Sequence, residues 1–225
     1  MRKVKFAEGE YYHVYNRGVE KRDIFMGDED YQRFILDLRL YNNEKSFANI
    51  RRIALHEYEL EYEGEPLVEI VCYCLMPNHF HLLLCQKGEN GISRFMHKLG
   101  TGYTNYFNSR YERNGVLFQG TFKAVHIKSN KYLLHLSRYI HLNPLDIFQH
   151  DWKERGIRNK RRALQFVKDY PWSSLRYFIQ EKIPQYLEIA PDVVKTQFRD
   201  TKGYLQFLAD WLPSNYSVIA DYIIE

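Results

Sequence analysis

The sequence lacks the features that mark secreted, membrane-spanning and low-complexity proteins. It has only three cysteines in 225 residues, an odd number that argues against a disulfide framework. Its 12 glycines and 7 prolines are too few for a collagen-like or low-complexity chain. No apolar run approaches the roughly 18 residues that a membrane-spanning helix needs, and the basic N-terminus has no apolar signal-peptide core. We therefore expect a soluble cytoplasmic protein with no membrane partner.

Neither sign of charge dominates. The chain has 32 Lys and Arg against 28 Asp and Glu, a formal charge of +4, and 45% of its residues are hydrophobic. These values exclude an intrinsically disordered chain and permit a sizeable core. Aromatic residues are abundant, since 19 Tyr, 14 Phe and 3 Trp make up 16% of the chain.

The three cysteines lie on or beside one apolar segment, at Cys72, Cys74 and Cys85. One residue between Cys72 and Cys74 is too short a spacing for a structural zinc site, which needs two to four. We expect reduced thiols that serve as small apolar core side chains.

Hydrophobic periodicity predicts strands and helices through the first 142 residues. Asp28 can cap the first helix, and Pro77-Asn78 separates two apolar strands as a tight turn. Residues 53–63 alternate Glu with apolar residues, which favours a strand, although 54–58 could instead end a helix. The other predicted elements are strand 11–16, helix 29–42, strands 67–76 and 79–86, helix 92–113, strand 122–128 and helix 130–142.

This β-α-β-β-α-β order is that of the ferredoxin-like split βαβ fold, an α+β architecture with an antiparallel sheet and helices on one face. After residue 150 the sequence becomes strongly basic (Lys153 to Arg162) and then weakly amphipathic. We assign residues 1–150 to a main domain and 151–225 to a basic linker with a small helical C-terminal extension.

Positive charge is concentrated between residues 94 and 131. This window holds seven basic residues and one acidic residue, Glu112, which gives +6 and exceeds the charge of the whole chain. Aromatic residues are interleaved with the basic ones, a composition that suits single-stranded nucleic acid, because phosphates bind Lys and Arg while bases stack on rings. The alternative is a solvated helix face whose aromatics belong to the core. Tyr111 and Phe118 are the better stacking candidates.

His79-Phe80-His81 begins a predicted strand. The two-residue period places both imidazoles on one face and Phe80 on the other. Two neutral imidazoles can bind one divalent cation if a third ligand comes from elsewhere. They could equally be two surface histidines beside a core phenylalanine.

The helix predicted over 130–142 carries a polar stripe of Tyr132, His135, Tyr139 and Asn143 at helical spacing. The amide oxygen of Asn143 could complete a metal site, and Tyr139, one turn earlier, could attack a phosphate that the metal polarises. Alternatively, Tyr139 packs in the core and Asn143 ends the helix before Pro144.

Four segments together resemble the REP-associated tyrosine transposases, which are single-tyrosine members of the HUH endonuclease superfamily. They are YHVYNRG, CLMPNHFHLLL, GTFKAVHIKSNKYLLHLSRYIHLNPL and YPWSS, in this order between about Tyr11 and Ser174. The resemblance implies His79 and His81 as ligands of Mg²⁺ or Mn²⁺, Tyr139 as nucleophile and Asn143 as third ligand.

The same resemblance implies cleavage of single-stranded DNA beside hairpins, with a 5′-phosphotyrosine link and a free 3′-OH. Rejoining reverses the step, so no nucleotide cofactor is implied. A homodimer and a monomer are both compatible with it. Candidate phosphate contacts are Arg94, Lys98, Arg110, Lys123, Lys128 and Arg138.

Two rival functions stay open: a non-catalytic DNA- or RNA-binding regulator derived from a transposase, and a replication-initiator or relaxase nuclease, which usually has a longer chain. The chain departs from the family pattern in an apparent insertion at 48–65 and in its extension beyond YPWSS. His13, on the first strand, could touch substrate or stabilise the site, and we expect the structural role. His141 points away from Tyr139 on the helix, so we do not count it as a ligand.

Overall fold

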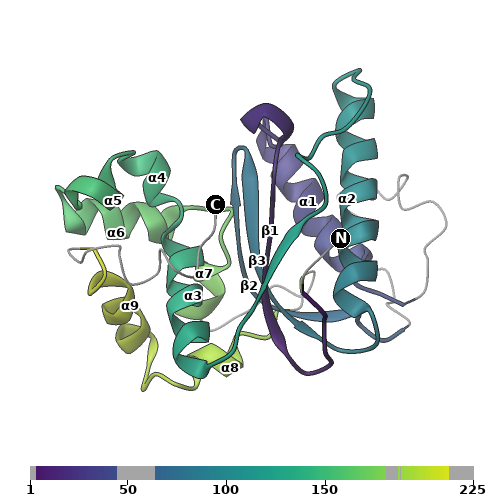
Figure 1. The fold of residues 1–225 in the computed structure, drawn as a ribbon. Helices are drawn as coiled ribbons and strands as arrows, with labels where there is room; N and C mark the ends of the chain where they lie inside the picture. Colours follow the sequence, from purple (N-terminus) through teal and green to yellow (C-terminus); the bar gives the residue numbers. More distant parts are fainter. Residues whose placement is uncertain (1–3, 45–63, 181–186, 188, 213–225) are drawn as a thin grey trace.

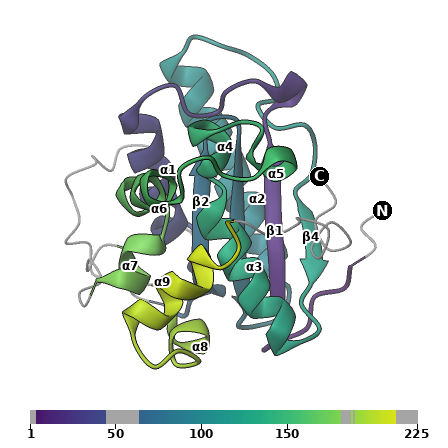
Figure 2. The ribbon, with the colours of Figure 1, turned by 90° about the vertical axis from the view of Figure 1, so that its left-hand side faces the viewer.

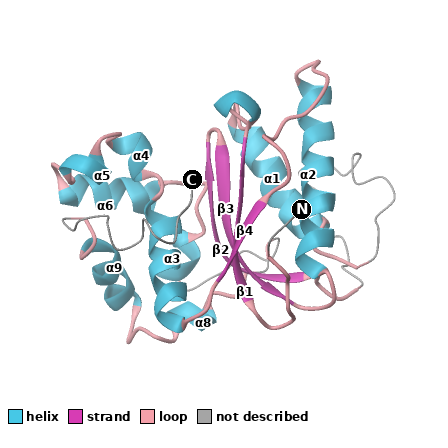
Figure 3. Ribbon diagram, viewed as in Figure 1, coloured by secondary structure: helices cyan, strands magenta, loops and turns pink. Residues whose placement is uncertain are grey.

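A four-stranded antiparallel sheet forms the centre of the computed structural model, which describes residues 4–44, 64–180, 187 and 189–212 (Figure 1). The strands, shown in magenta in Figure 3, are β1 (Tyr11–Arg17), β2 (Val68–Met76), β3 (His79–Gln86) and β4 (Lys123–His126). Their order in the sheet is β2-β3-β1-β4. The expected α+β class and antiparallel sheet are confirmed. The predicted strand at 53–63 lies outside the described residues, as does nearly all of the apparent insertion.

The two central strands determine which side chains share a face. β1 pairs with β3 from Tyr11 opposite Cys85 to Arg17 opposite His79. Because side chains alternate along a strand, His79 and His81 share one face of the sheet while Phe80 lies on the other. All three cysteines are buried, reduced thiols, as predicted.

Two helices cover the face on which Phe80 lies: α1 (Asp28–Leu40) and α2 (Gly91–Arg110) (Figure 1). Phe34 of α1 packs on Phe80 with their ring centroids 5.0 Å apart. Asp30, rather than the expected Asp28, caps α1, since its Oδ2 accepts hydrogen bonds from the backbone N–H groups of Met26 (2.8 Å) and Gly27 (3.2 Å).

The opposite face is covered by α3 (Asn130–Leu142) and by helices that follow it in the chain (Figure 2). The expectation of helices on one face therefore holds for α1 and α2 but not for the whole chain. The reason is that α3 presents Leu133, Leu136 and Ile140, all buried, and these need an apolar partner surface. The later helices are α4 (Leu145–Phe148), α5 (Trp152–Arg155), α6 (Lys160–Asp169), α7 (Leu175–Ile179), α8 (Asp192–Lys195) and α9 (Thr201–Ala209).

Backbone hydrogen bonds join the C-terminal part to β2. Leu75 N–H donates to Trp172 O (2.9 Å), and Ser174 N–H donates to Tyr73 O (3.0 Å). The basic segment expected as a linker is largely helical, forming α5 and the first turn of α6. The division into 1–150 and 151–225 stays a prediction. Among the described residues, no helix is both long and apolar enough to cross a membrane.

Candidate active site

Four of the residues singled out in the sequence meet between β3 and α3. His79 Nε2 lies 3.3 Å from Asn143 Oδ1. The ring of His81 meets the ring of Tyr139 edge-on, with centroids 5.3 Å apart and an interplanar angle of 79°. The strand period brings the two histidines to this face, and one turn of α3 places Tyr139 and Asn143 beside them.

His79 is oriented from both sides of its ring. Its Nδ1 lies 2.6 Å from Asn78 Oδ1, in the turn between β2 and β3. Its ring is nearly perpendicular to that of His81, with centroids 5.0 Å apart. The Asn78 contact directs Nε2 of His79 toward Asn143.

His81 is almost fully buried and contacts a third histidine. Its Nδ1 lies 2.9 Å from Nε2 of His13 on β1. Burial is the main cause that lowers the pKa of both imidazoles, that of His13 to about 3 and that of His81 well below its usual value, and the nearby His79 adds to the effect at His81. Both rings are therefore neutral at physiological pH, the form in which histidine binds metals.

Tyr139 is 2% exposed and lies under an ammonium group that the sequence did not predict. Lys153 of α5 holds its Nζ 5.9 Å from the centre of the Tyr139 ring. Asp146 positions this lysine through a 2.9 Å ion pair, and the other carboxylate oxygen of Asp146 accepts a 2.6 Å hydrogen bond from Trp152 Nε1. Nothing in the sequence indicated this contact beyond the basic character of the segment that begins at Lys153.

The donors at this site fit a divalent cation. Nε2 of His81 is buried and has no hydrogen-bond partner among the described residues, as expected of a nitrogen whose partner is a metal ion. With His79 Nε2 and Asn143 Oδ1, the set is two imidazole nitrogens and one amide oxygen. In the described part of the chain no cluster of three or more His, Cys, Asp or Glu suits a metal, so a cation held here would need the amide oxygen of Asn143 as its third protein donor.

A basic cleft leads to the two histidines. It has a volume of about 510 Å³, and its lining includes the basic side chains of Arg17, Lys21 and Lys123. The ammonium of Lys123 lies 5.7 Å from the centre of the Tyr15 ring, which also lines the cleft. Of the six candidate phosphate contacts, Lys123 is the one that lines this cleft.

Three other candidates, all on α2, belong to the opposite face of the sheet. Arg94 pairs with Glu44 at 3.5 Å, and Lys98 donates to the backbone carbonyl of Asn43 at 2.5 Å. Arg110 pairs with Glu29 of α1. The fifth candidate, Lys128, is exposed just beyond the end of β4.

Arg138 is only 8% exposed and joins α3 to α9. Its Nη1 donates to Phe207 O (3.1 Å), its Nη2 contacts His135 Nδ1 (2.6 Å), and its guanidinium stacks 4.1 Å from the centre of the Trp211 ring. Burial lowers its pKa to about 10. We assign Arg138 to helix docking and leave it out of the proposed DNA interface. The predicted stripe on α3 thus divides, since His135 faces α9 while Tyr139 faces the sheet.

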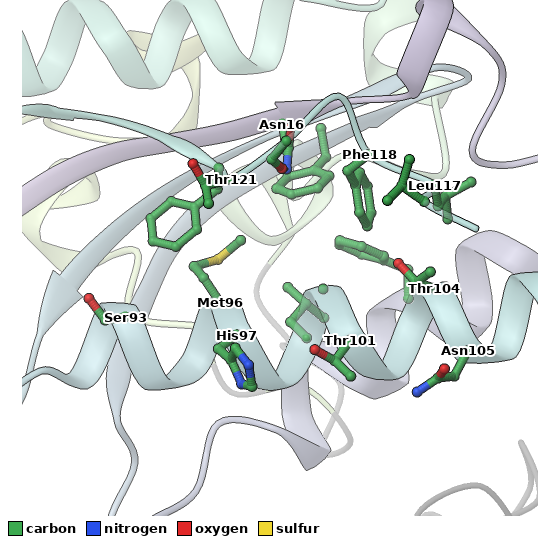
Figure 4. Close-up of a pocket in the computed structure, with 17 residues that line it drawn as sticks. Asn16, Ser93, Met96, His97, Thr101, Thr104, Asn105, Leu117, Phe118 and Thr121 are labelled. Carbon is green, nitrogen blue, oxygen red and sulfur yellow. The ribbon is translucent and has the colours of Figure 1, made fainter. Parts of the chain in front are cut away.

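The proposed stacking residues also lie away from the histidines. Tyr111 donates its hydroxyl to Asp30 Oδ2 (2.7 Å). Phe118 lines a second cavity of about 520 Å³, between α2 and the segment that precedes β4 (Figure 4). In this cavity Phe118 and Met96 lie near Phe80, whose strand neighbours His79 and His81 face the other way.

His141 does not approach the histidine cluster, in agreement with the sequence-based expectation. It is fully buried, with Nδ1 2.7 Å from the hydroxyl of Tyr204 and Nε2 2.9 Å from Oγ of Ser174. This network ties α3 to α9 and to the YPWSS segment.

The part of the chain that contains the three histidines, Tyr139 and Asn143 matches a known protein family. Residues 11–143, more than half of the chain, match the family described as IS200-like transposase. The fold is similar to the solved structure of a REP-associated tyrosine transposase bound to a REP hairpin, with a TM-score of 0.53 and 13% identity over 85% of this chain and 92% of the other. No curated protein matches the sequence.

Proposed function

The chain belongs to the IS200-like transposase family, and from this we propose that it is a metal-dependent enzyme that cuts and rejoins single-stranded DNA beside hairpins. The observation that carries the proposal is the meeting of His79, His81, Asn143 and Tyr139 across β3 and α3. Among solved structures, the similar REP-associated transposase is bound to a hairpin, which supports hairpin DNA as the partner.

In the proposed reaction Tyr139 is the nucleophile. Its hydroxyl oxygen forms a bond to the scissile phosphorus, the bond from phosphorus to the 3′ oxygen breaks, and the products are a 5′-phosphotyrosine and a 3′-OH. The phenolic proton leaves to solvent, and the departing 3′ oxygen takes up a proton. Attack of a 3′-OH on the phosphotyrosine reverses the step, so the energy of the phosphodiester is conserved.

His79, His81 and Asn143 would hold Mg²⁺ or Mn²⁺. When bound, the cation supplies Lewis-acid polarisation of the scissile phosphate. The basic side chains that line the cleft, Arg17, Lys21 and Lys123, would hold flanking phosphates electrostatically. Because Tyr139 is 2% exposed, the segment that covers it, with Lys153, must move or the phenol must rotate for the phosphate to reach it.

The covalent adduct tests the nucleophile directly. End-labelled single-stranded hairpin DNA is incubated with the protein and Mn²⁺, and a denaturant-stable adduct is sought. We expect it with the wild type and not with Tyr139→Phe, which lacks only the attacking oxygen. Tyr132→Phe, on the same helix, is the control and should keep the adduct.

Two results would overturn the proposal. The first is an adduct that persists in Tyr139→Phe, and the second is the absence of an adduct with a broad pool of hairpins. Tight hairpin binding without any adduct would favour the rival function, a non-catalytic nucleic-acid-binding regulator.

The metal site has its own test. Chelation with EDTA should abolish adduct formation, and added Mn²⁺ should restore it. Asn143→Ala should weaken Mn²⁺ binding roughly tenfold or more, because one of three protein donors is lost, whereas Asn143→Asp keeps an oxygen donor and should bind Mn²⁺ at least as well as wild type. Titration calorimetry measures both; equal affinity in Asn143→Ala and wild type would remove Asn143 from the ligand set.

A further inference from the structure

We propose that His13 is a positioning residue: it accepts a hydrogen bond from Nδ1–H of His81 and thereby keeps the Nε2 lone pair of His81 available to the metal ion. The inference rests on the proposed function, because it concerns the same metal site. It gives a role to a buried histidine that is neither the proposed nucleophile nor one of the proposed metal ligands.

The register of the sheet places the two rings together. Tyr15 of β1 pairs with His81 of β3, so His13, two residues away on the same face, is the diagonal neighbour of His81. The rings are close to parallel, with an interplanar angle of 25° and centroids 5.1 Å apart. Both side chains are buried, at 0% exposure for His13 and 2% for His81.

Only one arrangement of protons allows His81 to bind a metal through Nε2. A neutral imidazole carries one N–H, so the 2.9 Å contact has its proton either on His81 Nδ1 or on His13 Nε2. If the proton is on His13 Nε2, then His81 must carry its own proton on Nε2, where it blocks a metal. If it is on His81 Nδ1, the Nε2 lone pair of His81 is available.

The two ring nitrogens outside this contact are consistent with a proton on Nδ1 of His81. His81 Nε2 and His13 Nδ1 are both buried without a hydrogen-bond partner among the described residues. A buried polar ring with an unsatisfied nitrogen costs stability, which an aliphatic side chain at position 13 would avoid. The compensation that we infer is orientation of a ligand, the task that outer partners of metal-bound histidines perform.

Two substitutions at this position separate the hydrogen bond from packing. His13→Gln puts an amide oxygen near the position of Nε2 and keeps an acceptor, whereas His13→Leu fills the space without one. Tyr12→Phe is the matched control, since it is on the same strand but faces the other side of the sheet. Mn²⁺ affinity is measured by the electron paramagnetic resonance signal of free Mn²⁺, with unfolding curves for each variant.

We expect His13→Leu to weaken Mn²⁺ binding about 10- to 100-fold, in the range found when partners of metal-bound histidines are removed. His13→Gln should stay within about threefold of wild type, and Tyr12→Phe should match wild type. If His13→Leu binds Mn²⁺ as tightly as wild type, or His13→Gln loses as much as His13→Leu, the inference is wrong while the proposed metal site stands.

Wild-type protein provides a second readout that does not require the leucine variant to fold. In ¹⁵N NMR spectra of the Mg²⁺-loaded protein, His81 should carry its proton on Nδ1. A proton on Nε2 of His81 would overturn the inference. If the wild type binds neither Mn²⁺ nor Mg²⁺, the metal part of the proposed function fails, and the role of His13 fails with it.

Discussion

Burial lowers the pKa of two histidines that lie in different parts of the fold. His13 and His141 each have a pKa lowered to about 3 by burial, although one lies beside the proposed metal site and the other in the contact between α3 and α9. Neutral imidazoles at both positions act as hydrogen-bonding groups rather than as charges. For His13 and His141, the charge and the role of the side chain thus follow from burial and from hydrogen-bond partners, and residue type alone does not predict them.

Asp37 provides a pH-dependent prediction at this scale. Burial raises its pKa to about 7, although Arg33 pairs with it at 2.9 Å. The folded protein thus holds this proton more tightly than the unfolded chain, whose carboxyl has a pKa near 3.8. Stability from this residue is fully present below about pH 4 and is lost as the pH rises to about 7, by roughly 1–4 kcal/mol.

Asp37→Asn removes this titration and keeps a carbonyl acceptor for Arg33. The stability of Asp37→Asn minus that of wild type should therefore increase between pH 4.5 and pH 7.5. Urea unfolding at the two pH values measures the difference. A difference that does not change with pH would show that Asp37 is ionised throughout and that the ion pair outweighs its desolvation.

At the scale of elements, α3 is the part on which the site depends. It carries Tyr139 toward the sheet, and its other contacts fix its position. Arg138 joins it to α9, and His141 joins it to Ser174 of the YPWSS segment. Ser174 in turn is bonded to β2, because its Oγ accepts a hydrogen bond from Tyr73 N–H at 2.8 Å. The C-terminal segment thus connects the helix of the nucleophile to the sheet.

Ser174→Ala should destabilise the fold by about 1–3 kcal/mol, because it leaves a buried backbone N–H at Tyr73 and Nε2 of His141 without their partner. Thr196→Ala removes an exposed hydroxyl that donates to Asp192 O in its own turn, and should change stability by less than about 0.5 kcal/mol. Chemical denaturation compares the two. An equal effect of both substitutions would mean that the Ser174 network does not hold α3.

At the scale of the whole molecule, the sheet divides the positive charge of residues 94–131 between two faces. Arg94, Lys98 and Arg110 pair with groups that lie on the side of α1 and α2. Lys123 lines the cleft of His79 and His81. The window is continuous in the sequence but is not one binding surface in space.

This division predicts which lysines and arginines affect binding of single-stranded DNA. Lys123→Ala should weaken binding and reduce the salt dependence of log K by about one counterion. Arg94→Ala removes the same charge from the opposite face and should leave the binding of the cleaved strand nearly unchanged. Fluorescence anisotropy across a salt series measures both slopes. Equal losses in the two variants would show that DNA contacts both faces.

Local pattern was sufficient to predict most elements near the site. The strand 79–86 and the helix 130–142 have the bounds predicted from local sequence pattern, because the apolar run that follows the Pro77-Asn78 turn and the helical spacing from Leu133 to Ile140 are properties of neighbouring residues. The β-α-β-β-α-β order follows from the same local pattern, and the family resemblance adds Asn143 as the partner of His79 and His81.

Pairings between distant residues were decided only by the tertiary structure. The sequence indicates a basic, tyrosine-rich chain with neither disulfides nor long apolar runs, and it marks Tyr139 and the two histidines. It cannot show that His13 contacts His81, that Lys153 lies over Tyr139, or that Arg138 is buried against α9. Each of these depends on which face of a strand or helix meets which neighbour. That choice is made by the burial of apolar surface over the whole chain, because no local propensity distinguishes a charged side chain that meets solvent from one that meets another helix.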